Sequence, residues 1–239
     1  MLSLFFEVEV KPGRLDQYLQ LAAALRPELD ALGGCLFLDR FRSLSRDNLI
    51  LSYQIWQDEG AMTAWRVHAH HHDIQTLGRD KVFSDYRLRI AELAHEVKPG
   101  QAAWQPERRG TYNDPKRRAP TYVLAVETAA PQLSGVKDLP VASFSSVYRE
   151  GRFAHLVELP DEPTGVALST QLLAEPGADN IRVVEVTRDY GMYDRREAPQ
   201  YYPEKSRGGL SDDDNPPQRT SSGYTSRRGK GVGRADLLV

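Results

Sequence analysis

The sequence predicts an α+β fold made of a four-stranded unit, a shortened second unit and a tail. Residues 1–98 alternate between segments with the two-residue period of a strand and segments with helical spacing. Residues 121–199 repeat most of that order, and apolar residues become rare from residue 200 onward. We therefore divide the 239 residues into a first unit at 1–98, a linker at 99–120, a second unit at 121–199 and a disordered tail at 200–239.

The composition is typical of a globular protein of the cytoplasm. The chain is 40% hydrophobic and 27% charged, with a formal net charge of -2, which demands neither a membrane nor a specific nucleic-acid partner. Cys35 is the single cysteine, so an intrachain disulfide is impossible and a thiolate metal site is disfavoured. The opening apolar run at 2–6 is followed by Glu7 and Glu9, and is too short and acidic for a signal peptide.

Six segments of the first unit carry a clear period. They are a strand at 2–10, a helix at 14–32, strands at 35–42 and 49–56, a helix that Asp58 caps and that reaches residue 76, and a strand at 86–93. The order strand, helix, strand, strand, helix, strand is the split βαβ pattern of ferredoxin-like folds. Helices cover such a sheet on one face only, so a second subunit or a second copy must bury the other face.

The second unit resembles a shortened copy of the first. Its predicted elements are a strand at 122–127, a hairpin at 143–149 and 152–159, a helix at 163–173 and a strand at 181–186. A loop at 131–140 stands where the first helix would be, and a weak sequence echo between the two units leaves duplication and coincidence both open. The missing helix leaves less apolar surface to cover the first sheet, so we expect a homodimer rather than a pseudo-dimeric monomer.

A dense set of aromatic and charged residues runs through the third strand and second helix of the first unit. The sequence reads LSYQIWQDEGAMTAWR at 51–66, followed by His71, Gln75, Gly78-Arg79, Phe83 and Asp85-Tyr86-Arg87. This spacing resembles the antibiotic biosynthesis monooxygenase domain over about residues 1–95. The run RDYGMYDR at 188–195 resembles the segment that follows the last strand in single-domain relatives. The resemblance implies a dimeric α+β barrel with a small-molecule pocket between each sheet and its helices.

The resemblance also implies a chemistry. Members oxidise quinols or polycyclic phenols with molecular oxygen and without metal or flavin, and a subset cleaves heme. An electron-rich phenolate can itself reduce oxygen, so the protein need only bind the anion, exclude water and orient the reacting carbon. The expected function is cofactor-independent monooxygenation of a quinol-like or polyphenolic molecule, with heme binding or degradation as a minor alternative.

The family's functional positions can be transferred only in part. Trp65 matches the tryptophan of the heme-cleaving subset, whose histidine and asparagine fall on Gln75 and near Phe6. Trp56 matches a pocket tryptophan of the phenol-oxidising subset, whose asparagine, tyrosine and arginine positions hold Ser52, Met62 and Thr76. We predict His71 and Trp65 as catalytic residues. The predicted substrate contacts are Phe6, Tyr53, Trp56, His68, His72, Gln75 and Phe83.

The histidine run at 68–72 is open to more than one interpretation. On one continuous helix His68 and His72 share the stripe of Trp65 and face a pocket, whereas the family match favours His71. A solvated cluster, an acid–base or orienting role for one ring, and metal or heme ligation all remain open, but no helical carboxylate completes a metal site, so none is predicted.

Two further alternatives remain open. Three arginines of the first unit could clamp an anionic substrate or form ion pairs with nearby aspartates; the pairs in question are Arg40, Arg66 and Arg79 with Asp39, Asp58 and Asp80. The incomplete set of family positions is also compatible with a noncatalytic role. In that case a degenerate tandem domain would bind a small hydrophobic ligand or another protein.

Overall fold

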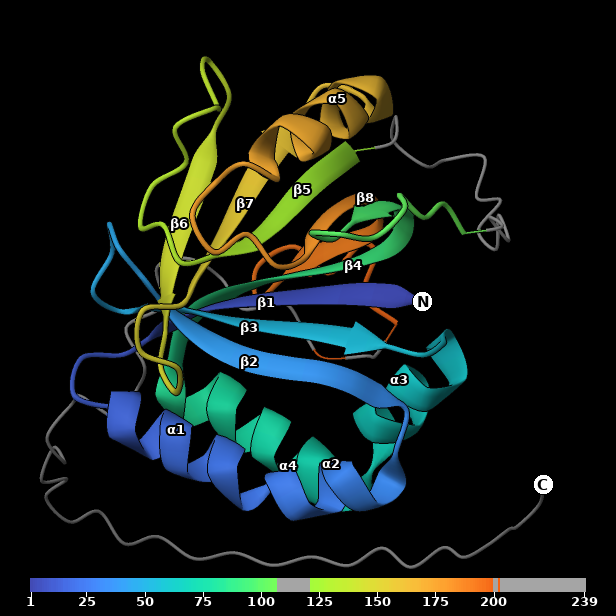
Figure 1. Ribbon diagram of the computed structural model, residues 1–239. Helices are drawn as coiled ribbons and strands as arrows, with labels where there is room; N and C mark the ends of the chain where they lie inside the picture. Colours follow the sequence, from blue (N-terminus) through green and yellow to red (C-terminus); the bar gives the residue numbers. More distant parts are fainter. Residues whose placement is uncertain (107–120, 200–201, 203–239) are drawn as a thin grey trace, which may run out of the picture. The chain divides into compact units, whose positions relative to one another are not determined.

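The structure is a computed structural model that describes residues 1–106, 121–199 and 202 (Figure 1). Its first half contains β1 Leu2–Val10, α1 Leu15–Ala24, α2 Arg26–Leu32, β2 Cys35–Ser43, β3 Leu49–Trp56, α3 Glu59–Val67, α4 Ala69–Leu77, a π-helical turn η1 Gly78–Val82 and β4 Phe83–Val97. Its second half contains β5 Thr121–Thr128, β6 Val141–Ser146, β7 Phe153–Leu159, α5 Glu162–Leu172 and β8 Ile181–Gly191. The predicted tail lies outside the described residues apart from Tyr202, and so does most of the predicted linker.

The eight strands close into one antiparallel barrel within the chain. The order around it is β1-β3-β2-β6-β7-β5-β8-β4. Each half therefore has the strand order of a ferredoxin-like unit, and two pairings, β2 with β6 and β4 with β8, join the halves. Helices α1 to α4 cover the outer face of the first half and α5 covers that of the second (Figure 1).

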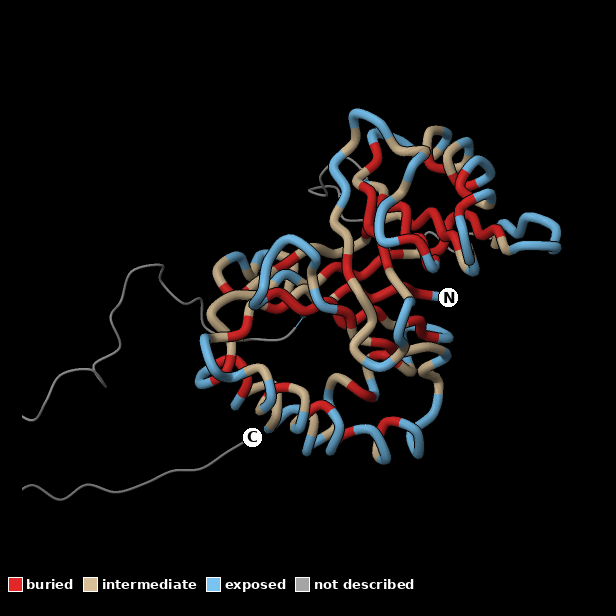
Figure 2. Tube along the Cα trace, turned by 60° about the vertical axis from the view of Figure 1, so that its left-hand side comes forward, coloured by how far each residue is buried: buried red, intermediate tan, exposed pale blue. Residues whose placement is uncertain are grey.

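Burial follows the two faces of each strand. Residues that alternate along the strands fill the barrel interior, among them Phe5, Leu51 and Val184. Their neighbours face outward beneath the helices, among them Trp56 and Ile90. Figure 2 shows the same arrangement, with buried segments along the strands and exposed segments on the outer side of the helices.

The strands agree with the predictions more closely than the helices do. Strand β3 has the predicted bounds, whereas β4 extends in both directions beyond the predicted 86–93. The single helix predicted at 14–32 is wrong, because the chain divides at Leu25 and Pro27 opens a new helix, where its missing N–H is tolerated. The second predicted helix is also divided, at His68, whose backbone is extended with φ -59° and ψ 127°.

An ionic cluster inside the barrel ties the two halves together. The guanidinium of Arg182 on β8 donates to Glu96 at 2.7 Å, to Glu127 at 2.8 Å and to the hydroxyl of Tyr53 at 3.0 Å. Glu96 and Tyr53 belong to the first half, and Arg182 and Glu127 to the second. All four side chains are almost completely buried, so the hydrogen bonds replace solvation that each charge lost on folding.

The second half packs its helix directly on its sheet. A side chain at Gly165 of α5 would place Cβ 2.5 Å from Leu159 and 2.9 Å from Val183, so only glycine allows this approach. As predicted, no helix stands between β5 and β6 in the described chain.

The barrel closes within one chain, and this bears on whether two chains must associate. The second half buries the inner face of the first sheet, so the physical reason for expecting a homodimer is removed. Among the described residues no helix has both the length and the apolar character needed to cross a membrane.

Candidate functional site

A cavity of about 180 Å³ lies between the outer face of the first half-sheet and helices α1 to α4. One water molecule needs roughly 10–15 Å³ on the same measure, so an organic guest of a dozen or more non-hydrogen atoms fits. The walls are mostly apolar or aromatic, with side chains from β1 to β4 and from α1 to α4. Such a lining with few polar groups is typical of a small-molecule site.

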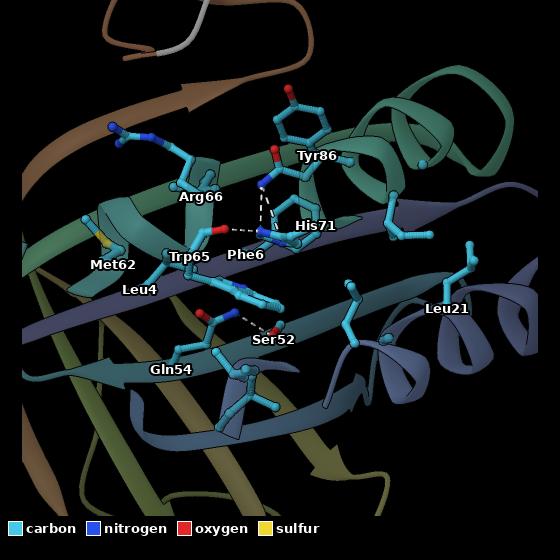
Figure 3. A pocket seen from close by; sticks show the side chains of 18 of the residues that line it. Leu4, Phe6, Leu21, Ser52, Gln54, Met62, Trp65, Arg66, His71 and Tyr86 are labelled. Atoms are coloured by element: carbon cyan, nitrogen blue, oxygen red, sulfur yellow. Dashed lines mark hydrogen bonds between the residues drawn. The ribbon is translucent and has the colours of Figure 1, made fainter. Parts of the chain in front are cut away.

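The floor of the cavity carries a directed chain of hydrogen bonds on β3. The indole Nε1–H of Trp56 donates to Oε1 of Gln54 at 2.9 Å, and Nε2–H of Gln54 donates to Oγ of Ser52 at 3.1 Å. An indole nitrogen can only donate, so it fixes the orientation of the amide and makes Ser52 an acceptor from Gln54. Figure 3 shows this contact between Gln54 and Ser52, and both residues line the cavity.

His71 is held against Trp65 above this floor (Figure 3). The two rings stack with centroids 4.3 Å apart and planes 15° apart. The Nδ1 of His71 lies 2.8 Å from the backbone carbonyl oxygen of Trp65, which can only accept, so Nδ1 carries the proton. Burial lowers the pKa of His71 to about 4. The ring is therefore neutral at pH 7, with the basic lone pair on Nε2.

The other histidines of the run lie elsewhere. The break at His68 resets the helical phase, so His71 faces the cavity while His68 and His72 do not line it, contrary to the continuous-helix expectation. The Nδ1 of His70 lies 2.7 Å from Glu28 on α2, and the His68 ring stacks on Trp65 with ring centroids 5.5 Å apart. Among the described residues no group of three or more His, Cys, Asp or Glu side chains is arranged to hold a metal ion.

Positive charge borders the cavity. Five arginines line it, and no Asp or Glu does so among the described residues; the five are Arg26, Arg40, Arg66, Arg79 and Arg195. The aspartate that the sequence placed near Arg40 does not neutralise its side chain, because Asp39 receives Arg149 at 2.7 Å instead. Asp58 likewise caps α3 by accepting the N–H of Ala61 at 2.8 Å. Arg26 pairs with Asp30 at 2.8 Å, yet guanidinium groups outnumber carboxylates at the described wall, which favours a negatively charged guest.

The structure brings most of the predicted site residues together. Six of the nine line the cavity: Phe6, Trp56, Trp65, His71, Gln75 and Phe83. Tyr53 does not, because side chains alternate along β3 and Tyr53 points into the barrel, where it stacks on Phe5 at 5.0 Å. His72 instead stacks on Tyr202, with ring centroids 5.8 Å apart.

Sequence reasoning missed that the second half contributes to the site. Tyr190 and Arg195 line the cavity, as does Tyr202. The signal was present, because Tyr190 and Arg195 both belong to the run RDYGMYDR at 188–195. Burial raises the pKa of Tyr190 to about 12, so this phenol stays protonated.

Comparisons with known proteins agree with this architecture. The profile of the antibiotic biosynthesis monooxygenase family matches residues 1–77. A protein named jasmonate monooxygenase ABM, from Pyricularia oryzae, is 31% identical over 230 residues, which cover 86% of this chain and 100% of that protein. The chain belongs to the antibiotic biosynthesis monooxygenase family.

Solved structures are also similar to this family member, at low identity. An anthrone oxidase-like protein is 12% identical and covers 80% of this chain and 92% of its own, with a TM-score of 0.37. A conserved protein from Methanosarcina mazei Go1 is 19% identical and covers 37% of this chain and 88% of its own, with a TM-score of 0.35.

Proposed function

We propose that the protein is a monooxygenase that uses molecular oxygen, without metal or flavin, to oxidise a small acidic organic molecule held in the cavity. A quinol-like or polyphenolic compound meets this description when ionised, and the name of the Pyricularia oryzae relative adds jasmonate as a candidate. One observation carries the proposal: a neutral, half-buried His71 faces an apolar cavity that five arginines border. This arrangement suits the formation and retention of an organic anion.

The chemistry assigns separate tasks to the residues. Nε2 of His71 accepts a proton from a phenol or from a carbon next to a carbonyl group, and the Ser52 hydroxyl donates to the oxygen on which negative charge develops. The resulting carbanion or phenolate transfers electrons to oxygen. For a methylene group the balance is CH₂ plus O₂ giving C=O plus H₂O, so the substrate supplies all four electrons. Trp65, Trp56 and Phe6 exclude water from the reacting carbon.

Oxygen uptake tests the proposal. We expect the protein to consume oxygen faster than a protein-free control when it is given a panel of quinols, polyphenols and jasmonate. Removing the base with His71→Gln should slow uptake by about 10²–10⁴-fold. The matched control is His70→Gln, because His70 lies on the same helix but contacts Glu28 outside the cavity. It should retain the native rate.

A noncatalytic ligand-binding role is the second candidate. It is favoured by Ser52, Met62 and Thr76, which stand where phenol-oxidising relatives carry asparagine, tyrosine and arginine. Tight binding of these compounds with no oxygen uptake above the protein-free rate would select this alternative. Homodimerisation is not needed under either function, because one chain supplies every described wall of the cavity.

A further inference from the structure

Two guanidinium groups from opposite halves of the chain meet at one phenol oxygen beside the cavity. Nη1 of Arg79 donates to the hydroxyl oxygen of Tyr86 at 2.9 Å, and Nη1 of Arg195 donates to the same oxygen at 2.8 Å. Arg79 comes from η1, Tyr86 from β4, and Arg195 from the segment after β8. All three side chains line the cavity.

Close packing of the end of β8 on β4 places Arg195 beside Tyr86. Gly191 at the end of β8 passes so close to β4 that a Cβ would lie 2.5 Å from the backbone oxygen of Tyr86. That same oxygen accepts the N–H of Met192 at 3.1 Å, and the N–H of Gly191 donates to the Asp194 carbonyl at 2.8 Å. This turn reverses the chain and returns Arg195 to Tyr86. Two residues of the run RDYGMYDR therefore have an assigned structural role: Gly191 permits the turn, and Arg195 reaches the cavity.

The cluster has the properties of an anion site. Arg79 is only 4% exposed, so its charge acts in surroundings that screen it weakly. A guanidinium carries five N–H donors, and the Tyr86 oxygen takes one from each arginine. Backbone carbonyl oxygens also hold the two guanidinium groups in place, that of Met192 for Arg79 and that of Gly191 for Arg195, each at 3.4 Å. An anionic group at this wall would meet two fixed guanidinium groups and no carboxylate of the described lining. Tyrosine rings flank them, with Tyr190 5.3 Å from the Arg195 guanidinium carbon.

We infer that Arg79, Tyr86 and Arg195 form an anchor for the carboxylate, or an equivalent anionic group, of the guest, and that Arg195 makes the second half a determinant of specificity. The inference rests on the proposed function only in assuming that the cavity takes an organic guest. It adds a predicted orientation of the bound guest. The anionic group binds at Tyr86, and the apolar body extends toward Trp65 and Met62 (Figure 3).

A pair of matched fluorescent dyes tests the anchor without requiring turnover. The anionic dye is 8-anilinonaphthalene-1-sulfonate, and the neutral dye N-phenyl-1-naphthylamine has the same aromatic skeleton without the sulfonate. We expect the full-length protein to bind the anionic dye more tightly. Arg195→Gln should weaken that binding about ten- to hundredfold while leaving the neutral dye within about twofold. Arg195→Lys should recover part of the loss, because it restores charge but not the planar fork.

Arg196→Gln is the matched control, since Arg196 is the next residue and its exposed side chain pairs with Asp194. It should leave both dyes unchanged. Jasmonate should displace the anionic dye from the native protein far better than its neutral methyl ester does. Equal losses for both dyes in Arg195→Gln, equal displacement by acid and ester, or no binding of either dye would overturn the anchor. Anion selectivity without oxygen uptake would instead refute the monooxygenase and leave the anchor intact.

Discussion

At the scale of single residues, the proposed chemistry depends on the neutral state of His71. Burial holds its pKa at about 4, against 6.5 in an unfolded chain. Between these values the unfolded state binds more protons, so His71 contributes its full stabilisation above pH 6.5 and loses it as the pH falls toward 4. We expect the free energy of unfolding of the native protein to fall roughly 2 kcal/mol further than that of His71→Phe between pH 7 and 4.5. Urea denaturation at the two pH values measures this difference.

The control for this prediction is His70→Gln, whose exposed ring should leave the native pH dependence almost unchanged. Identical losses in the native protein and in His71→Phe would contradict the assignment of a half-buried, neutral ring. The prediction of His71 itself came from family spacing and not from helical period, since the period favoured His68 and His72. The sequence could not reveal the backbone break that reverses this choice. Tyr53 was predicted beside Trp56 in the site but does not line the cavity. It is three residues from Trp56, so the two side chains lie on opposite faces of β3.

At the scale of elements, the N-caps of α3 and α5 provide a matched comparison. The Asp58 carboxylate accepts the N–H of Ala61, and the Asp161 carboxylate accepts that of Thr164, both at 2.8 Å. Each Asp→Ala substitution should move the urea unfolding midpoint to lower denaturant concentration, because it removes the cap from the first turn of its helix. Only Asp58→Ala should also weaken binding of the naphthalene dyes, because α3 carries Trp65 on the cavity wall. Equal effects of the two substitutions on dye binding would place the guest elsewhere.

The elements also show what periodicity can and cannot predict. Strand β3 is delimited by a polar turn before it and a capping aspartate after it, so its bounds were predictable. The helices end and restart at Leu25 and His68, although apolar residues continue at helical spacing through both positions. Hydrophobic periodicity therefore could not predict these two breaks. Strand β4 is longer than predicted because of long-range pairing: residues 83–85 at its start pair with β1, and residues 95–97 at its end pair with β8, about ninety residues away along the chain. No local pattern encodes these contacts.

At the scale of the whole molecule, the composition of the cavity depends on how the two halves join. The sequence indicated two similar strand orders, but the pairings of β2 with β6 and β4 with β8 are long-range and leave no periodic signal. The second pairing brings the segment after β8 alongside β4, and so places Arg195 at Tyr86. No site residue was predicted in the second half, and its contribution to the site follows from barrel closure.

The ionic cluster in the barrel interior therefore links stability to the site. Arg182→Gln would remove the buried cation that Glu96 and Glu127 share, leaving them Lys98 at 3.2 Å and Arg149 at 3.8 Å, both partly exposed. Burial already raises the pKa of Glu127. Removing one partner of a buried ion pair costs about 3–5 kcal/mol, so urea unfolding should shift to much lower denaturant concentration. Arg152→Gln is the control, since it breaks only surface contacts, with the exposed Asp179 and with the Gly177 carbonyl oxygen, and should cost far less. Because the cluster spans both halves, the native protein should unfold in one transition by fluorescence and circular dichroism alike. Two separate transitions, or equal costs for the two substitutions, would show that the halves fold independently of this cluster.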